Sequence, residues 1–145
     1  APQNSLGVSG GILHRACLTA PSQERETASR VLGVISDWGF SLAPVVVEMP
    51  VKYTTRRSTH KDIDRMMGVI AEIKRAYSKD AFFGVTPFSW KGNVPKEIQA
   101  SRILSAMTKE EHDAVSWPRK SLRHNVIDAI GIGLWRLGRL GRGST

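Results

Sequence analysis

Glu48 is an acidic residue at the end of an apolar run. It follows Val45–Val47, three β-branched residues without polar alternation, a pattern typical of a strand that is covered on both faces. Ligands of α/β sheets collect beyond the carboxyl ends of such strands. Glu48 is therefore a candidate metal ligand, and the alternative is an exposed carboxylate at a strand end.

A second group of polar residues lies within a long apolar segment. His124, Asn125 and Asp128 are three and four positions apart, so on a helix their side chains can address one point in space. A charged group among apolar residues needs a partner or a metal ion. Asp128 could instead pair with a neighbouring arginine, and His124 could be an ordinary core or surface histidine.

These residues have to be positioned by helices and strands that alternate along the chain. The Gly10-Gly11 pair between Leu6–Val8 and Ile12–Leu18 predicts a hairpin. Beyond it, the apolar spacing predicts helices over 28–38, 63–77, 95–104 and 122–137, strands over 45–48 and 81–88, and a loop over 89–93. The order favours an α/β layered domain with a mixed sheet.

Local signals refine these boundaries. Capping boxes are expected from Thr59 to Asp62 and from Thr108 to Glu111, because each pair has the spacing at which two side chains cap the start of a helix. Gly131 and Gly133 would permit close packing of the last helix, at some cost in helix propensity. The residues 138–145 are rich in glycine and arginine, and we expect a flexible basic tail there.

Three segments together resemble the RuvC-type Holliday-junction resolvases, and in particular their phage-like members within the ribonuclease H-like superfamily. Val45–Pro50 resembles the second acidic strand of that family, and His124–Leu134 resembles its carboxy-terminal acidic helix. Trp90–Lys96 is similar to a linking motif that follows the last core strand. The segments occur in family order and cover most of the chain.

The resemblance implies an α/β fold of the ribonuclease H-like class, with a mixed β-sheet flanked by helices and a single nuclease domain over residues 1–145. It implies a crossover-junction endodeoxyribonuclease that uses two Mg²⁺ ions, or Mn²⁺, to hydrolyse phosphodiesters of branched DNA. Glu48 and Asp128 would be metal ligands. Asn125 and His124 would occupy further catalytic positions.

The resemblance also implies a homodimer, since cutting a four-way junction takes two active sites. Met66, Met67, Gly68 and Ile70 could form the interface, because a small residue among larger apolar ones allows close approach; burial of these residues in the monomer core is the alternative.

Two features depart from the family pattern. The first family aspartate lies on an opening strand, which we expect upstream of Ala1, so the domain would be N-terminally truncated and this fragment would bind DNA weakly and cut poorly. Asn125 stands where the family has a further carboxylate. The alternative interpretation is therefore a catalytically impaired ribonuclease H-like domain that binds nucleic acid, and RNA remains an alternative substrate.

The charge of the chain favours a polyanionic partner. The formal net charge is +8, and each phosphate contact by a cation releases counterions. Tyr53 or Trp90 could stack on an unpaired base, although a tryptophan is more often a core residue. The predicted contacts to nucleic acid are Lys52, Arg56, Arg57, Lys61, Lys91, Lys96, Arg119, Lys120 and Arg123, and each could equally be a solvated surface charge.

The composition argues against two other classes of protein. No stretch approaches the roughly 18 apolar residues that a membrane span needs, so we expect no membrane partner. Cys17 is the only cysteine, which excludes a disulfide within the chain and favours an intracellular compartment. A cytoplasmic protein of bacterial or phage origin is the corresponding expectation.

Overall fold

The computed structural model describes residues 13, 15–17, 24–39, 44–50 and 60–140, without the side chains of residues 24, 25 and 60–62. The chain divides into two compact units: unit 1 comprises Ala1–Leu18 and Trp90–Thr145, and unit 2 comprises Thr19–Ser89. A single domain over residues 1–145 stays a prediction. The predicted hairpin and the capping box at Thr59 lie outside the described residues.

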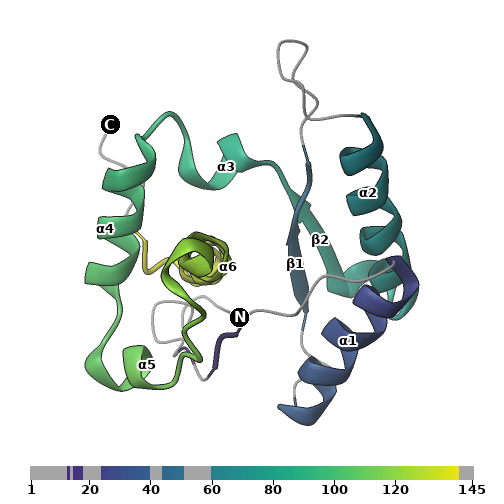
Figure 1. The fold of residues 1–145 in the computed structure, drawn as a ribbon, viewed down its shortest axis with the longest axis horizontal. Helices are drawn as coiled ribbons and strands as arrows, with labels where there is room; N and C mark the ends of the chain where they lie inside the picture. The colour runs from purple at the N-terminus through teal and green to yellow at the C-terminus, as the bar shows by residue number, and fades with distance from the viewer. Residues whose placement is uncertain (1–12, 14, 18–23, 40–43, 51–59, 141–145) are drawn as a thin grey trace. The chain divides into compact units, whose positions relative to one another are not determined.

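Helices and strands follow one another as the α/β class requires, which confirms that class (Figure 1). The elements are α1 (Glu24–Asp37), β1 (Val45–Glu48), α2 (His60–Arg75), η2 (Lys79–Ala81), β2 (Phe82–Val85), α3 (Pro87–Lys91), α4 (Lys96–Ala106), α5 (Lys109–Asp113), η3 (Lys120–Leu122) and α6 (Arg123–Arg136). No helix in the described ranges is long and apolar enough to cross a membrane.

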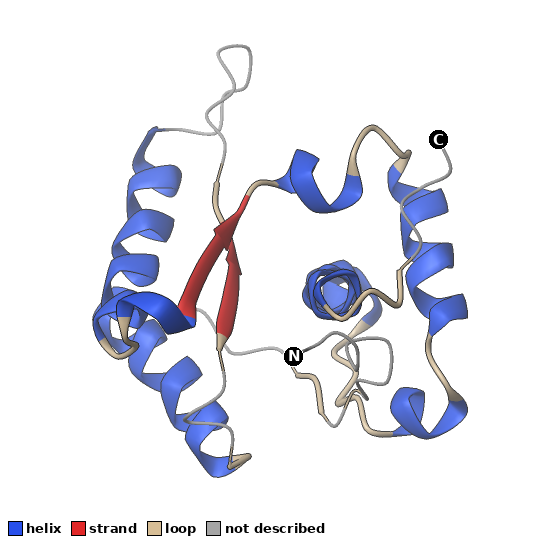
Figure 2. Ribbon diagram, turned by 180° about the vertical axis from the view of Figure 1, so that it is seen from behind, coloured by secondary structure: helices blue, strands red, loops and turns tan. Residues whose placement is uncertain are grey.

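Unit 2 is a strand pair with two helices. β1 and β2 are parallel, with Val45 opposite Phe82 and Glu48 opposite Val85, and they are the red arrows in Figure 2. A parallel pair needs a crossover connection, and α2 provides it. α1 packs against α2, and Gly39, with φ of 80°, ends α1 where an αL residue commonly ends a helix.

The second predicted strand is shorter than expected. β2 ends at Val85, and α3 begins at Pro87, where the fixed φ of proline suits the first turn of a helix. The Thr86 hydroxyl accepts a hydrogen bond from the Ser89 backbone N–H at 3.2 Å, as an N-capping side chain does. The prediction of a strand through Phe88 and of a loop over 89–91 is therefore wrong.

Unit 1 is built around α6, which Figure 1 shows end-on beside α4. Val126, Ile130 and Leu134 recur at helical spacing on α6 and are at most 2% exposed. Ile103 of α4 is fully buried. A Cβ on Gly131 would lie 2.5 Å from Ile103 Cδ1, so the predicted close packing is confirmed at Gly131, whereas Gly133 is exposed and has open space around it.

Glu111 is a buried carboxylate at the start of α5. It completes the predicted capping box with Thr108: each side chain accepts a hydrogen bond from the other residue's backbone N–H. The Arg139 guanidinium binds the same carboxylate with N–O distances of 2.5 and 2.6 Å, and the Leu13 N–H donates to it. Arg139 and Leu140 are thus anchored although we predicted a flexible tail from residue 138; residues 141–145 lie outside the described ranges.

Candidate functional site

Glu48 is the last residue of β1, as the sequence predicted. It is partly buried, and the Met49 N–H donates to the Val85 carbonyl at 2.7 Å, which continues the strand pairing one residue further. The carboxylate therefore stands at the carboxyl edge of the parallel pair. This edge is where α/β sheets bind ligands.

α6 presents His124, Asn125 and Asp128 on one stretch of helix, three and four residues apart. His124 and Asn125 are exposed, and Asp128 is partly buried. Within the described part of the chain, Asp128 makes neither a hydrogen bond nor an ion pair, so the alternative of pairing with an arginine finds no support there. The three residues lie on one helix, as their spacing predicted.

The two predicted metal ligands lie in different units. Glu48 belongs to unit 2 and Asp128 to unit 1, and each position is defined only within its own unit. Among the residues that the structure describes, no group of three or more His, Cys, Asp or Glu side chains could hold a metal ion. The pairing of Glu48 with Asp128 around a cation stays a prediction. A carboxylate suits such a cation, because Mg²⁺ prefers oxygen ligands and keeps several of its waters.

Glu111 and Asp128, the two described carboxylates of unit 1 that are not exposed, have different surroundings. Hydrogen bonding by Arg139 is the main reason why the pKa of Glu111 falls from 4.5 to about 2; burial opposes the change, and the Thr108 and Leu13 N–H groups add to it. Glu111 is therefore committed to structure. Asp128 has no such partners in the described ranges.

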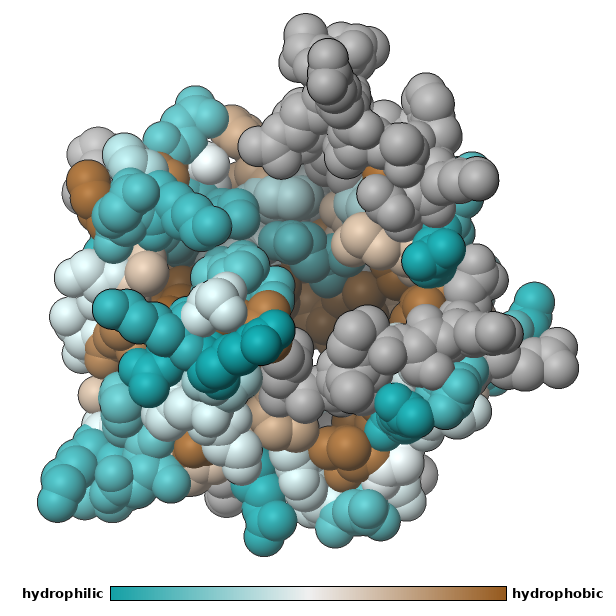
Figure 3. Space-filling model, viewed as in Figure 1, coloured by the Kyte–Doolittle hydropathy of each residue, from teal (hydrophilic) through white to brown (hydrophobic). Residues whose placement is uncertain are grey.

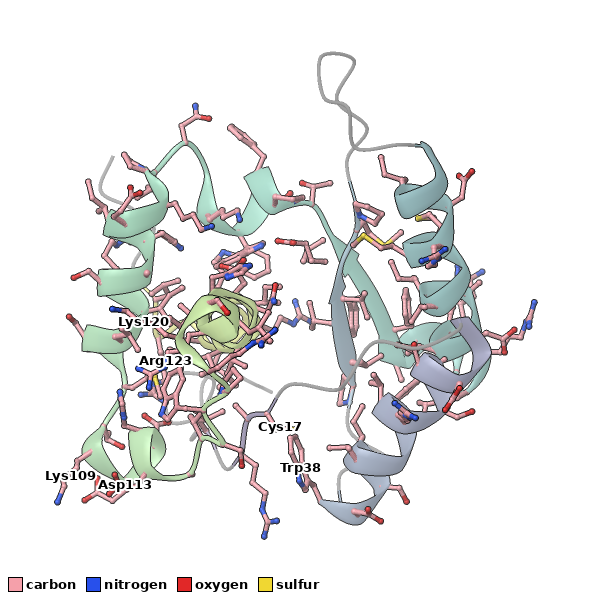
Figure 4. All side chains as sticks on the ribbon, in the orientation of Figure 1. Cys17, Trp38, Lys109, Asp113, Lys120 and Arg123 are labelled. Atoms are coloured by element: carbon pink, nitrogen blue, oxygen red, sulfur yellow. The ribbon has the colours of Figure 1, made fainter. Side chains whose placement is uncertain are left out.

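Several of the predicted basic contacts lie together at the start of α6. Arg119 precedes η3, Lys120 opens it and Arg123 opens α6; all three side chains are exposed. Figure 4 shows Lys120 and Arg123 beside one another, and Figure 3 shows hydrophilic side chains over this part of unit 1. We name Arg119, Lys120 and Arg123 the basic corner.

The other predicted basic contacts are dispersed or undescribed. Lys96 is exposed at the first position of α4, and Lys91 is partly buried, with its Nζ 5.3 Å from the centre of the Trp90 ring. Lys52, Arg56 and Arg57 lie outside the described residues, as do Tyr53 and the side chain of Lys61. Their contacts to nucleic acid stay predictions.

Trp90 is a core residue. Only 4% of it is exposed, and its ring packs so closely on α6 that a Cβ on Gly131 would lie 2.6 Å from Cζ3. A ring held in this way has no free face on which a base could stack. Of the two alternatives for Trp90, the structure therefore shows the core residue and not the stacking surface, because the indole completes the apolar packing of unit 1.

Trp117 is the aromatic residue that the sequence reasoning missed. The His112 ring lies 5.0 Å from it between centroids, and the Arg123 guanidinium lies 5.6 Å from its ring centre. Trp117 is partly buried. The signal that could have identified it is its position two residues before Arg119, in a segment with few other apolar residues.

Ile70 and the two methionines of α2 have different environments. Ile70 is 7% exposed and belongs to the core of unit 2, whereas Met66 is 50% exposed and Met67 is 41% exposed. The predicted dimer interface therefore loses Ile70, and the two methionines remain available to a second copy.

Comparison of the chain with protein families, with curated proteins and with solved structures found no match.

Proposed function

We propose that this chain is a ribonuclease H-like nuclease domain that cleaves branched DNA, such as four-way junctions, with the help of divalent cations. The proposal extends the α/β class to the finer fold that the sequence resemblance implies. It also assigns a homodimer, since symmetric junction cutting takes two active sites.

The observation that carries the proposal is the state of Asp128. Its carboxylate lies partly buried on an otherwise apolar helix, and no described residue binds it. A carboxylate on an otherwise apolar helix gains from a cationic partner to the extent that it is shielded from water. A metal ion would supply such a partner, and the neighbouring His124 and Asn125 would complete a polar face from which a ligand could be bound.

The position of Glu48 also supports the proposal. It stands at the carboxyl edge of a parallel strand pair, in the part of an α/β sheet where catalytic groups collect. Mg²⁺ retains several waters when it binds to protein, so it needs few carboxylates. Glu48 and Asp128 would each be a cation ligand, and Asn125 could add a neutral carbonyl oxygen beside Asp128.

Bound divalent cations would supply an activated water and stabilisation of the leaving oxygen in phosphodiester hydrolysis. The chain's own residues would position the substrate: the basic corner binds backbone phosphates on the helix that carries Asp128. His124 is exposed one position after Arg123 and could hold a proton for the leaving group. The net charge of +8 would draw DNA to the protein from solution.

The test measures both cation binding and cleavage in the full-length protein. We expect Asp128→Asn and Glu48→Gln each to weaken Mn²⁺ binding and to slow cleavage of a synthetic four-way junction by more than about 100-fold, because even groups that only orient metal ligands contribute roughly 10- to 100-fold. Asp113→Asn in unit 1 and Asp80→Asn in unit 2 are matched controls, since both acids are exposed. Neither control should change cleavage.

The proposal fails if no cleavage occurs with Mg²⁺ or Mn²⁺ and Glu48→Gln leaves DNA binding unchanged. That outcome would favour the impaired domain that binds nucleic acid without cutting it. Cleavage that survives both Asp128→Asn and Glu48→Gln would likewise remove the assigned metal ligands.

A further inference from the structure

The basic corner of unit 1 concentrates positive charge on a short stretch of chain. Arg119, Lys120 and Arg123 lie within five residues, and all are exposed. None of them makes an ion pair within the described ranges. The first turn of α6 holds no acidic residue, and Leu122 provides no side-chain cap, so the local field stays positive.

Trp117 gives this corner a feature that a solvated charge cluster lacks. The Arg123 guanidinium lies 5.6 Å from the Trp117 ring centre, and the His112 ring lies 5.0 Å away at an interplanar angle of 41°. An aromatic ring attracts a guanidinium and limits the rotamers of a long side chain. Arg123 is therefore held in one region of space although it is exposed.

The indole nitrogen indicates which part of Trp117 matters. Trp117 Nε1 is buried and has no hydrogen-bond partner among the described atoms. A buried tryptophan normally finds a partner for its N–H. Trp117 therefore acts on the position of Arg123 through its ring and not through its N–H. A phenylalanine at this position should do the same.

The position of the corner relates it to Asp128. Asp128 follows Arg123 by five residues on α6, a rise of about 7.5 Å along the helix axis. Five residues also turn the helix by about 140°, so Arg123 and Asp128 share the helix but lie on different faces of it. The same helix would bind the backbone and the cation.

We propose that the basic corner is a contact site for the DNA phosphate backbone, in which Trp117 is the positioning residue for Arg123. This inference rests on the proposed function for its substrate and for its phosphate contact, and it adds the residue that positions Arg123 for that contact. The contact is to phosphate, so it is independent of base sequence and is the same in duplex and branched DNA.

The first measurement is the salt dependence of DNA binding by the full-length protein. Binding of fluorescein-labelled duplex and four-way-junction DNA is followed by anisotropy in EDTA, so that the result does not depend on metal or cleavage. Arg123→Ala should make the plot of log K against log[salt] shallower by about one for both probes. Lys109→Ala is the matched control, because Lys109 is an exposed cation that Figure 4 shows apart from Lys120 and Arg123.

The second measurement is a double-mutant cycle. Trp117→Leu should weaken binding about two- to fivefold, the range expected from losing one cation–π contact, and Trp117→Phe should restore binding. In the Arg123→Ala background, Trp117→Leu should have no further effect. A Trp117 that only stabilised the fold would lower binding in both backgrounds, so the cycle separates positioning from folding.

Two results would overturn the inference: an unchanged salt slope for Arg123→Ala, or equal losses for Arg123→Ala and Lys109→Ala, which would indicate a general effect of net charge. Neither result concerns cleavage. Conversely, the protein could show no metal-dependent cleavage while Arg123→Ala and Trp117→Leu still change DNA binding as expected. That result would contradict the nuclease proposal and would support the phosphate site.

Discussion

Unit 1 and unit 2 bury different kinds of side chain. The buried side chains of unit 2 in the described ranges are Ala28, Ile70 and Ile73, all of them apolar. Unit 1 also buries Gln99 and Glu111, which are 3% and 1% exposed. A buried charge is tolerated only where partners satisfy it. Unit 1 therefore combines an apolar core with a few directional contacts to buried polar groups, whereas the buried side chains described in unit 2 are apolar alone.

Within unit 1, the same comparison of contacts distinguishes the two acids Glu111 and Asp128. In unit 1 the Glu111 carboxylate is used by Arg139, Thr108 and Leu13, while Asp128 has no partner in the described ranges. A burial pattern alone would rank Glu111 as the functional residue. The hydrogen bonds instead assign the Glu111 carboxylate to the structure of unit 1.

The largest expected effect comes from removing Arg139. Arg139→Ala should lower the free energy of unfolding by about 3–5 kcal/mol, because it leaves the buried Glu111 carboxylate without its cation. Denaturant titration measures the loss, and hydrogen exchange should rise more in α6 than in α2. Arg65→Ala is the control in unit 2: Arg65 is exposed, so the change should stay within about 0.5 kcal/mol.

An Arg139→Ala protein as stable as the wild type would show that the ion pair contributes nothing beyond what apolar packing supplies. Equal increases of hydrogen exchange in α2 and α6 would show that the two units unfold together. Either result would contradict the contrast between unit 1 and unit 2.

The next effect is on pH dependence. The Glu111 pKa is about 2 in the folded protein and ordinarily 4.5, so the folded state favours the charged form. Its stabilisation is present above about pH 4.5 and is lost as the pH falls towards 2, by up to about 3 kcal/mol. The unfolding free energy of the wild type should therefore fall more steeply over this range than that of Glu111→Gln. Parallel curves for the two proteins would contradict the assignment.

Local sequence signals predicted much of both units. Gly39 ends α1 and the Thr108–Glu111 box opens α5, because each depends on residues only a few positions apart. The carboxyl-end position of Glu48 and the shared helix of His124 and Asp128 were predictable for the same reason. Such features follow from backbone geometry and need no knowledge of distant contacts.

Contacts between distant segments were not predictable in this way. The burial of Glu111 depends on Arg139, 28 residues further on, and the loss of Trp90 as a stacking surface depends on Gly131. The sequence patterns singled out each of these residues, but they did not indicate which of them contact one another.

The smallest predicted effect compares one substitution in the two units. A Cβ on Gly131 would lie 2.5 Å from Ile103 Cδ1 in the packed core of unit 1, so Gly131→Ala should cost about 1–3 kcal/mol of unfolding free energy. A Cβ on Gly84 in unit 2 would lie 3.0 Å from Cγ of Met49, a flexible side chain that can move, so Gly84→Ala should stay within about 0.5 kcal/mol.

Gly133→Ala is the matched helix control for this comparison. Gly133 is exposed on α6 with nothing within 4 Å of the added Cβ, so alanine should stabilise the protein by about 0.5–1 kcal/mol through helix propensity. Thermal denaturation ranks the three variants. If Gly84→Ala costs as much as Gly131→Ala, then unit 2 is packed as tightly as unit 1, and the contrast between the units would rest on Glu111 and Arg139 alone.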